Sequence, residues 1–135
     1  MNTKQDELCV DVLAAIAWAD GEVSETELDK AIDLIDRMEY VDRPRLQEIL
    51  VIPHNMPSTA KLETLDRKTR VRLLHDAYLL AAYCGGVDTE ELELLRGIAA
   101  TILPESRWEE AEGCLKAYAD YERRCDTLWG VTHLG

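Results

Sequence analysis

The residues best suited to chemistry gather in one short turn near the amino terminus. Asp20 and Glu22 stand two residues apart, and Ser24 and Glu27 follow them closely. Carboxylate and hydroxyl oxygens grouped in this way are preferred ligands of hard divalent cations such as calcium, magnesium and manganese. The spacing is not that of an EF-hand, because the twelfth position from Asp20 is Ala31 rather than a bidentate glutamate. The turn is therefore a candidate divalent-metal site, and a solvated acidic turn is the alternative interpretation.

Helix capping explains part of this pattern. Ser24 and Glu27 match a capping box, and Gly21 suits the left-handed residue that ends the preceding helix. Capping requires neither Asp20 nor Glu22. Asp20 also lies at the carboxyl end of its helix, where negative charge is unfavourable by about 0.3–1 kcal/mol. These two residues are therefore the principal candidates for metal ligands, with Glu27 as a third.

The turn has a second copy 64 residues further along the chain. Residues 19–28 are ADGEVSETEL and residues 83–92 are YCGGVDTEEL, and each copy follows an apolar run. Asp88 and Glu91 match the capping box again, whereas cysteine and glycine replace the two extra acids. The second turn is thus the poorer candidate for a metal. The duplication predicts two related helix–turn–helix hairpins whose apolar helices pack side by side.

No sequence pattern predicts catalysis. His75 and Asp76 are adjacent on a predicted helix, so their side chains point about 100° apart and cannot form a catalytic pair. The chain has no GxSxG or HExxH motif and no phosphate-binding glycine-rich loop. Its four cysteines and three histidines lack zinc-ligand spacing. We therefore expect a non-enzymatic protein with no organic cofactor; an enzyme whose site assembles from residues scattered in sequence is the weaker alternative.

The elements that must position these residues are helices along nearly the whole chain. Apolar residues recur at steps of three and four, and no segment gives a convincing strand pattern. The first helix is apolar on all sides from Val12 onward, which predicts that it is central and buried. The periodicity predicts about seven helices, at roughly 4–19, 25–39, 44–50, 58–62, 67–84, 89–103 and 106–129.

Several helix starts carry capping residues. Ser58 and Asp66 precede two of the helices, and Ser106 with Glu109 matches a capping box at the start of the last one. On that last helix, three- and four-residue steps predict an inward face of Trp108, Ala111, Leu115, Tyr118, Tyr121 and Cys125. An exposed aromatic patch there would instead indicate a partner site.

Composition places these helices in one folded unit. The chain has 135 residues, of which 47% are hydrophobic, and this suits a single globular domain over residues 1–135. Lys and Arg number 15 against 27 Asp and Glu, so the formal net charge is −12. Such acidity argues against nucleic-acid partners and fits metal ions or a basic partner. Four cations at positions 67–72 are expected to neutralise an acidic neighbouring helix, and attraction of an acidic partner surface is the alternative.

The expected location is cytoplasmic. No segment reaches the ~18 apolar residues of a membrane span, and the first residues lack the layout of a signal peptide. Three of the four cysteines sit in strongly helical patterns, which favours reduced, buried thiols. We therefore expect no direct membrane insertion.

The two hairpin segments carry a family resemblance. IAWADGEVSETEL (16–28), with its echo LAAYCGGVDTEEL (80–92), resembles the tellurite-resistance TerB-like family, in which an ADGxxS/DxxE-type hairpin is duplicated. The resemblance covers the chain from its first helix to about Leu103. It implies an all-α bacterial protein with a metal-binding acidic face and a role in tellurite resistance or another stress response. The acidic positions of the family correspond here to Asp20, Glu22, Glu27, Asp88 and Glu91.

Two functional expectations result. The first is a non-enzymatic, TerB-like stress-response protein with an acidic face that binds a divalent metal ion. The alternative is a metal-independent interaction or scaffold module whose acidic face meets an unidentified protein partner. A co-chaperone-like role belongs to this alternative, since a related helical domain occurs beside J domains.

Overall fold

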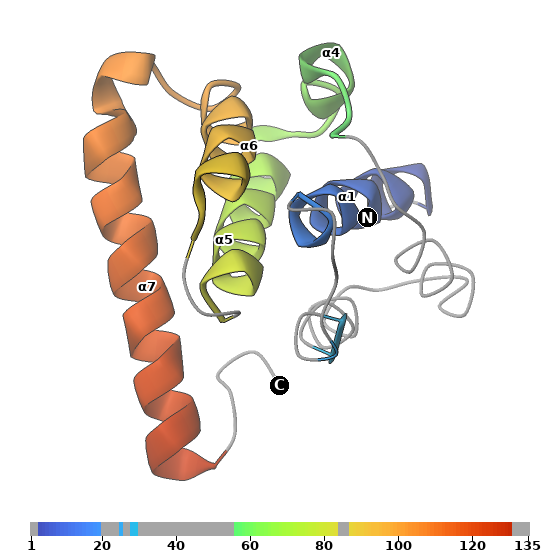
Figure 1. The fold of residues 1–135 in the computed structure, drawn as a ribbon. Coiled ribbons are helices and arrows are strands. Elements are labelled where there is room, and N and C mark those ends of the chain that lie inside the picture. Colours follow the sequence, from blue (N-terminus) through green and yellow to red (C-terminus); the bar gives the residue numbers. More distant parts are fainter. Residues whose placement is uncertain (1–2, 20–24, 26–27, 30–55, 84–86, 131–135) are drawn as a thin grey trace.

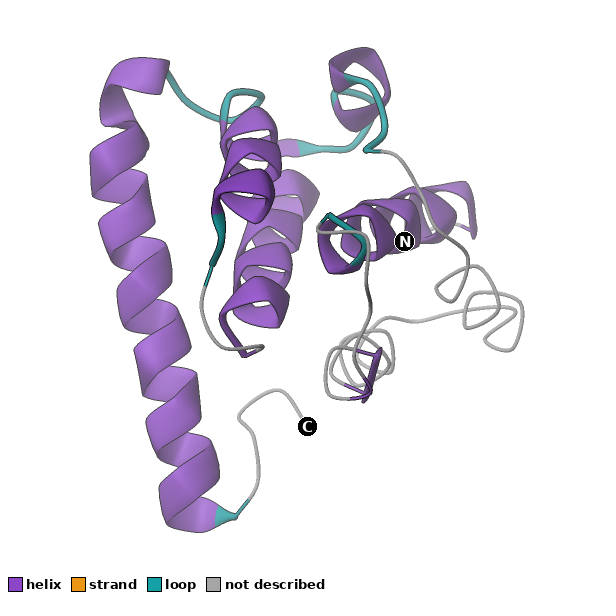
Figure 2. Cartoon of the chain, viewed as in Figure 1, coloured by secondary structure: helices purple, strands orange, loops and turns teal. Residues whose placement is uncertain are grey.

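The computed structural model describes residues 3–19, 25, 28–29, 56–83 and 87–130, and all regular structure in these ranges is helical (Figures 1 and 2). The described part of the chain is therefore all-α, as predicted. The predicted helices at 25–39 and 44–50 lie outside the described residues, except for positions 25, 28 and 29. The elements are α1 (Thr3–Ala17), α4 (Thr59–Leu62), α5 (Arg67–Tyr83), α6 (Thr89–Ala99), a 3-10 helix (Glu105–Arg107) and α7 (Trp108–Trp129).

Helix α5 is the centre of the described fold. It packs against α1, α6 and α7 (Figure 1). Nearly every residue from 73 to 82 is apolar and buried, so no broad face of this helix is left for water. The contact between α1 and α5 confirms the prediction that the two apolar helices pack together. None of the described helices is both long and apolar enough to span a membrane.

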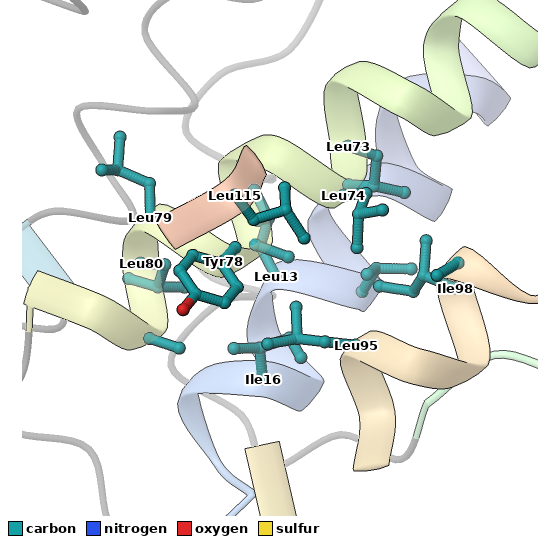
Figure 3. Close-up of a cluster of buried hydrophobic side chains, with 14 of the residues drawn as sticks. Leu13, Ile16, Leu73, Leu74, Tyr78, Leu79, Leu80, Leu95, Ile98 and Leu115 are labelled. Carbon is teal, nitrogen blue, oxygen red and sulfur yellow. The ribbon is translucent and has the colours of Figure 1, made fainter. Parts of the chain in front are cut away.

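One hydrophobic cluster joins α1, α5, α6 and α7 (Figure 3), and Leu62 adds a side chain from α4. Leu13 and Ile16 come from α1, Leu95 and Ile98 from α6, and Leu115 from α7, and all five side chains are fully buried among residues of α5. Burying a leucine or isoleucine stabilises a fold by about 1.5–3 kcal/mol relative to leaving it exposed. The predicted burial of α1 is confirmed, because its residues from Val12 to Ala17 are all buried.

Most predicted helix starts are confirmed. Ser58 Oγ accepts a hydrogen bond from the backbone N–H of Lys61 at 3.3 Å, and Asp66 Oδ1 accepts one from Thr69 at 2.7 Å. Helix α6 is shorter than the predicted 89–103, because it ends at Ala99 and the chain continues in turns. A proline disfavours helical conformation in the residue before it, so the chain leaves the helix ahead of Pro104.

The predicted capping box at the start of the last helix is wrong. Ser106 lies inside the 3-10 helix, whose N-cap residue is Pro104 and which has no side-chain cap hydrogen bond. Pro104 has φ −60°, and the proline ring imposes a value close to this one. At the other end, α7 stops at Gly130, whose φ of +72° is the left-handed conformation that favours glycine after a helix.

Candidate functional site

The second hairpin turn leads into a complete capping box. Asp88 Oδ1 accepts a hydrogen bond from the backbone N–H of Glu91 at 2.8 Å, and Glu91 Oε1 accepts one from the backbone N–H of Asp88 at 3.2 Å. Asp88 has extended backbone, as an N-cap residue requires, and Glu91 is buried. The prediction that Asp88 and Glu91 cap this helix is confirmed. Val87 and Leu92, the apolar residues on either side of this box, are both partly buried against the core.

The predicted metal ligands divide into two groups. Asp20, Glu22 and Glu27 lie outside the described residues, whereas Asp88 and Glu91 lie within them and are brought together by the cap. Among the residues that the structure describes, no three His, Cys, Asp or Glu side chains come together as a metal site would need. Each of the two second-hairpin carboxylates uses one oxygen for a backbone N–H, so their role as metal ligands stays a prediction.

A shallow hollow of about 290 Å³ lies beside the start of α6. Its apolar lining includes Val87 and Leu92, and charged residues of α7 form its remaining wall: Glu112, Lys116, Asp120 and Arg123. Tyr78 of α5 contributes an aromatic ring to this lining. Burial raises the pKa of the Tyr78 phenol, and the negative charges of Glu112 and Asp120 raise it further. The phenol is therefore a neutral hydrogen-bonding group at physiological pH.

His75 is held by its own helix. Its Nδ1 lies 2.8 Å from the carbonyl oxygen of Val71, one turn earlier, and its ring meets the edge of Tyr118 at a centroid distance of 5.3 Å. A carbonyl oxygen can only accept, so Nδ1 carries the proton in this contact. His75 is therefore held by hydrogen bonding within its own helix and by an aromatic contact with α7. Asp76, its neighbour in sequence, is buried.

Two arginines of the basic stretch at positions 67–72 donate hydrogen bonds to backbone carbonyl oxygens. Arg67 and Arg70 donate from Nη1 to the carbonyl oxygens of Ile102 and Thr101, in the turns that follow α6. Thr101 and Ile102 lie in the turns beyond Ala99, the last residue of α6, and a partly buried backbone carbonyl there needs a hydrogen-bond donor. Arg67 and Arg70 therefore pair with backbone carbonyl oxygens in the turns after α6, and neutralisation of an acidic helix by this stretch stays a prediction.

The inward face of α7 differs from the prediction at one aromatic position. Trp108, Leu115 and Cys125 are buried as predicted, and Ala111 and Tyr118 are partly buried. Tyr121, however, is 52% exposed, and Glu122 takes the inward position at 1%. The helix continues from Leu115 through Ala119 and Glu122 to Cys125, steps that fit helical geometry equally well. Apolar periodicity assigns a tyrosine rather than a glutamate to a buried position, so the prediction placed Tyr121 inward in place of its neighbour Glu122.

The carboxyl-terminal turns of α7 expose large apolar side chains that sequence analysis did not single out as exposed. Leu128 is 71% exposed and Trp129 is 69% exposed. Tyr121 and Leu128 are seven residues apart and so share one face of the helix. In Figure 1 these turns extend beyond the described ends of α5 and α6. We call Tyr121, Leu128 and Trp129 the exposed α7 patch.

The thiols also differ from expectation at one position. Among the described cysteines, Cys9, Cys114 and Cys125 form no disulfide, and Cys9 and Cys125 are buried, as predicted for helical cysteines. Cys114 is exposed, because it lies one position before the buried Leu115. Cys84 lies outside the described residues.

Comparison with known proteins gives no family assignment: the chain matches no protein-family model, no curated protein and no solved structure.

Proposed function

We propose that this chain is a non-enzymatic, TerB-like protein that works by binding, within a cytoplasmic stress response of the tellurite-resistance type. The observation that most directly supports this proposal is the Asp88–Glu91 capping box, with Val87 and Leu92 beside it. This capping box begins the helix that follows the second copy of the duplicated motif, which supports the hairpin that the resemblance implies. The contact between α1 and α5 supports it too, because these are the apolar helices of the two copies.

The proposed divalent-metal site centres on the first turn. Asp20 and Glu22 are its principal ligands, and Glu27 is a possible third that also serves a cap. The second turn supports this choice by contrast, since its two acids already bind backbone N–H groups. Asp88 and Glu91 are therefore secondary ligands in this proposal. A site made from one turn leaves several coordination positions to water, so calcium, magnesium or manganese should bind weakly, with Kd on the order of 0.1–1 mM.

Calorimetry with calcium and magnesium tests the metal proposal. The parent protein should give saturable heat, and the Asp20→Asn/Glu22→Gln double variant should give none. Glu90→Gln/Glu93→Gln is the matched control, because both side chains are exposed on α6 and it removes the same two charges. The control should bind like the parent. Absence of saturable heat in the parent at millimolar ion, or equal loss in the control, would reject a site at the first turn.

The second candidate function is a metal-independent interaction module, and the exposed α7 patch favours it. Monomeric proteins seldom leave grouped large apolar side chains in water without a partner or ligand to cover them. Trp and Tyr are also the residue types most enriched among binding hot spots. Arg123 and Arg124 lie beside Leu128 in a shallow hollow, which gives the patch a charged border.

Site-specific photo-crosslinking in the native cell tests this module. A benzophenone side chain at position 129 should form a defined adduct with one protein partner. The same group at position 109, which is exposed at the opposite end of α7, should not form it. Identical products at both positions, or none at position 129, would argue against the patch as a partner site. The Asp20→Asn/Glu22→Gln variant should retain the adduct if the module is independent of metal.

A further inference from the structure

A second cavity lies between the amino-terminal halves of α5 and α7, beside the turns that follow α6. Its volume is about 400 Å³, within the range of about 300–1,000 Å³ that is typical of small-molecule sites. The described residues that line it include the polar side chains of His75, Arg107, Glu110 and Cys114. The remaining lining is aliphatic: Val71, Leu74, Ile102, Leu103, Ala111 and Leu115.

The aliphatic lining is held in place by the core. Leu74 and Leu115 belong to the buried cluster that joins α5 and α7 (Figure 3), and Ile102 is also buried. His75 is fixed by its contacts with Val71 and Tyr118. The cavity walls are therefore formed before any ligand arrives, which lowers the entropy lost on binding. An apolar group in this cavity would be removed from water against side chains that need not rearrange.

Arginine side chains gather at and beside this cavity, although the chain as a whole is acidic. The formal net charge of the chain is −12, yet Arg107 lines the cavity. Arg67 donates a hydrogen bond to the carbonyl oxygen of Ile102, another lining residue. Arg70 reaches the adjacent carbonyl of Thr101. Each guanidinium has five N–H donors, and the hydrogen bond to the carbonyl uses one of them. Among the described residues that line the cavity, Glu110 is the only carboxylate, and it is ion-paired with Arg107.

We propose that this cavity binds a small hydrophobic monocarboxylate, such as a medium-chain fatty acid. The alkyl chain lies against Leu74, Ala111 and Leu115, and the carboxylate pairs with the guanidinium of Arg107. The ligand carboxylate takes the place of Glu110, which is readily exchanged because both partners of that ion pair are exposed and such pairs contribute little. A planar guanidinium can hold the incoming carboxylate through two parallel N–H donors.

A homologous series tests the apolar half of the proposal. Octanoate, below its micelle concentration and in metal-free buffer, should bind saturably at one site by calorimetry. Each methylene added between butanoate and octanoate should tighten binding by about two- to fourfold, because it is buried against the aliphatic lining. Absence of saturable octanoate binding, or affinity that does not change with chain length, would overturn the proposal.

A pair of alanine variants locates the site. Ala111→Leu places extra volume in the cavity and should weaken octanoate binding at least tenfold. Ala117→Leu adds the same volume at an exposed position of the same helix and should bind like the parent. Equal binding by both variants would place the ligand elsewhere and overturn the assignment.

Protection of Cys114 locates the ligand without changing the cavity. In a Cys84→Ser background, Cys114 is the one exposed thiol among the described cysteines, so a disulfide reagent should modify it first. Saturating octanoate should slow that modification at least fivefold. An unchanged rate at saturation would overturn the assignment even if Ala111→Leu failed to fold.

The head group is tested with charge-matched ligands. Arg107→Gln should weaken octanoate binding about five- to tenfold, whereas Arg124→Gln, at the far end of α7, should not. Octyltrimethylammonium, with the same chain and a cationic head, should bind much more weakly to the parent. Equal binding of both ligands would overturn the anionic preference. Because no divalent ion is present, these outcomes are independent of the metal proposal and of the exposed α7 patch.

Discussion

Asp88 and Glu91 show how a pair of acids serves the start of one helix. Each carboxylate satisfies a backbone N–H that the first turn of α6 cannot pair internally. Replacing an N-cap aspartate with alanine typically lowers the free energy of unfolding by about 0.5–2 kcal/mol. We expect Asp88→Ala to show this loss in urea unfolding, and Asp88→Ser to retain most of the stability. If Asp88→Ala unfolds at the parent's midpoint, the capping box contributes nothing measurable.

Asp66 makes a pH-dependent contribution at the start of α5. The hydrogen bonds from the backbone N–H and then the hydroxyl of Thr69 lower the pKa of its carboxyl below the ordinary value of 3.8. A carboxyl with a lowered folded-state pKa stabilises the fold above its unfolded-state pKa, and this contribution disappears as the pH falls through the folded-state value. The contribution of Asp66 is therefore complete above pH 3.8 and is lost progressively below it.

The Asp66→Asn variant isolates that effect, because asparagine caps well but does not titrate. Its stability near neutral pH should be close to that of the parent. Below pH 3.8 the parent should lose stability more steeply than the variant in parallel unfolding titrations. Parallel pH profiles for the two proteins would contradict the assignment of a lowered pKa to Asp66.

At the scale of elements, the turns that follow α6 depend on α5. Arg67 and Arg70 donate to two carbonyl oxygens there, and hydrogen bonds from charged donors contribute about 1.5–3 kcal/mol each. We expect Arg67→Gln/Arg70→Gln to lower the free energy of unfolding by about 1–3 kcal/mol and to speed amide exchange in residues 99–103. Lys68→Gln is the control, since this exposed lysine lies in the same stretch. A loss of similar size in the control would indicate a general charge effect instead.

Helices α6 and α7 each contain a glycine that packing does not explain. A Cβ atom built at Gly97 or Gly113 meets no described atom within 4 Å apart from its chain neighbours and the backbone of its own helix, and both positions are exposed. Glycine inside a helix is less favourable than alanine by about 0.5–1 kcal/mol. Gly97→Ala and Gly113→Ala should therefore each raise the thermal midpoint. A lowered midpoint would show that one of these helices bends or packs in a way that requires glycine.

At the scale of the whole molecule, the net charge of −12 opposes compactness. Sodium chloride screens this repulsion, since the Debye length falls from about 30 Å at 0.01 M to about 10 Å at 0.1 M. We expect the midpoint of thermal unfolding to rise over this range. Calcium chloride at equal ionic strength should raise it further only if a specific ion site exists. A midpoint that falls with added sodium chloride would show that ion pairs outweigh the net repulsion.

The sequence by itself determined the features that depend on short-range patterns. The bounds of α1, α4 and α5, the caps at Ser58, Asp66 and Asp88, and the burial of α1 all follow from capping residues and apolar periodicity. Such signals act between residues three or four apart, so neighbouring residues suffice to specify them. The all-α class of the described residues follows for the same reason. Two of the five predicted site residues, Asp88 and Glu91, form a cap between positions three residues apart, so the sequence alone was enough to predict that role.

Only the tertiary structure decided which face of each helix meets the core. The rotation of α7 against α5 placed Glu122 inward and Tyr121 outward, although both fit the helical period. The same rotation exposed Cys114 and brought Arg107 and Ala111 to the cavity beside His75. Arg67 and Arg70 donate hydrogen bonds to carbonyl oxygens that lie more than 30 residues away in the sequence. Periodicity limits a helix to a few possible buried faces, and the choice among them depends on packing between elements that are distant in sequence.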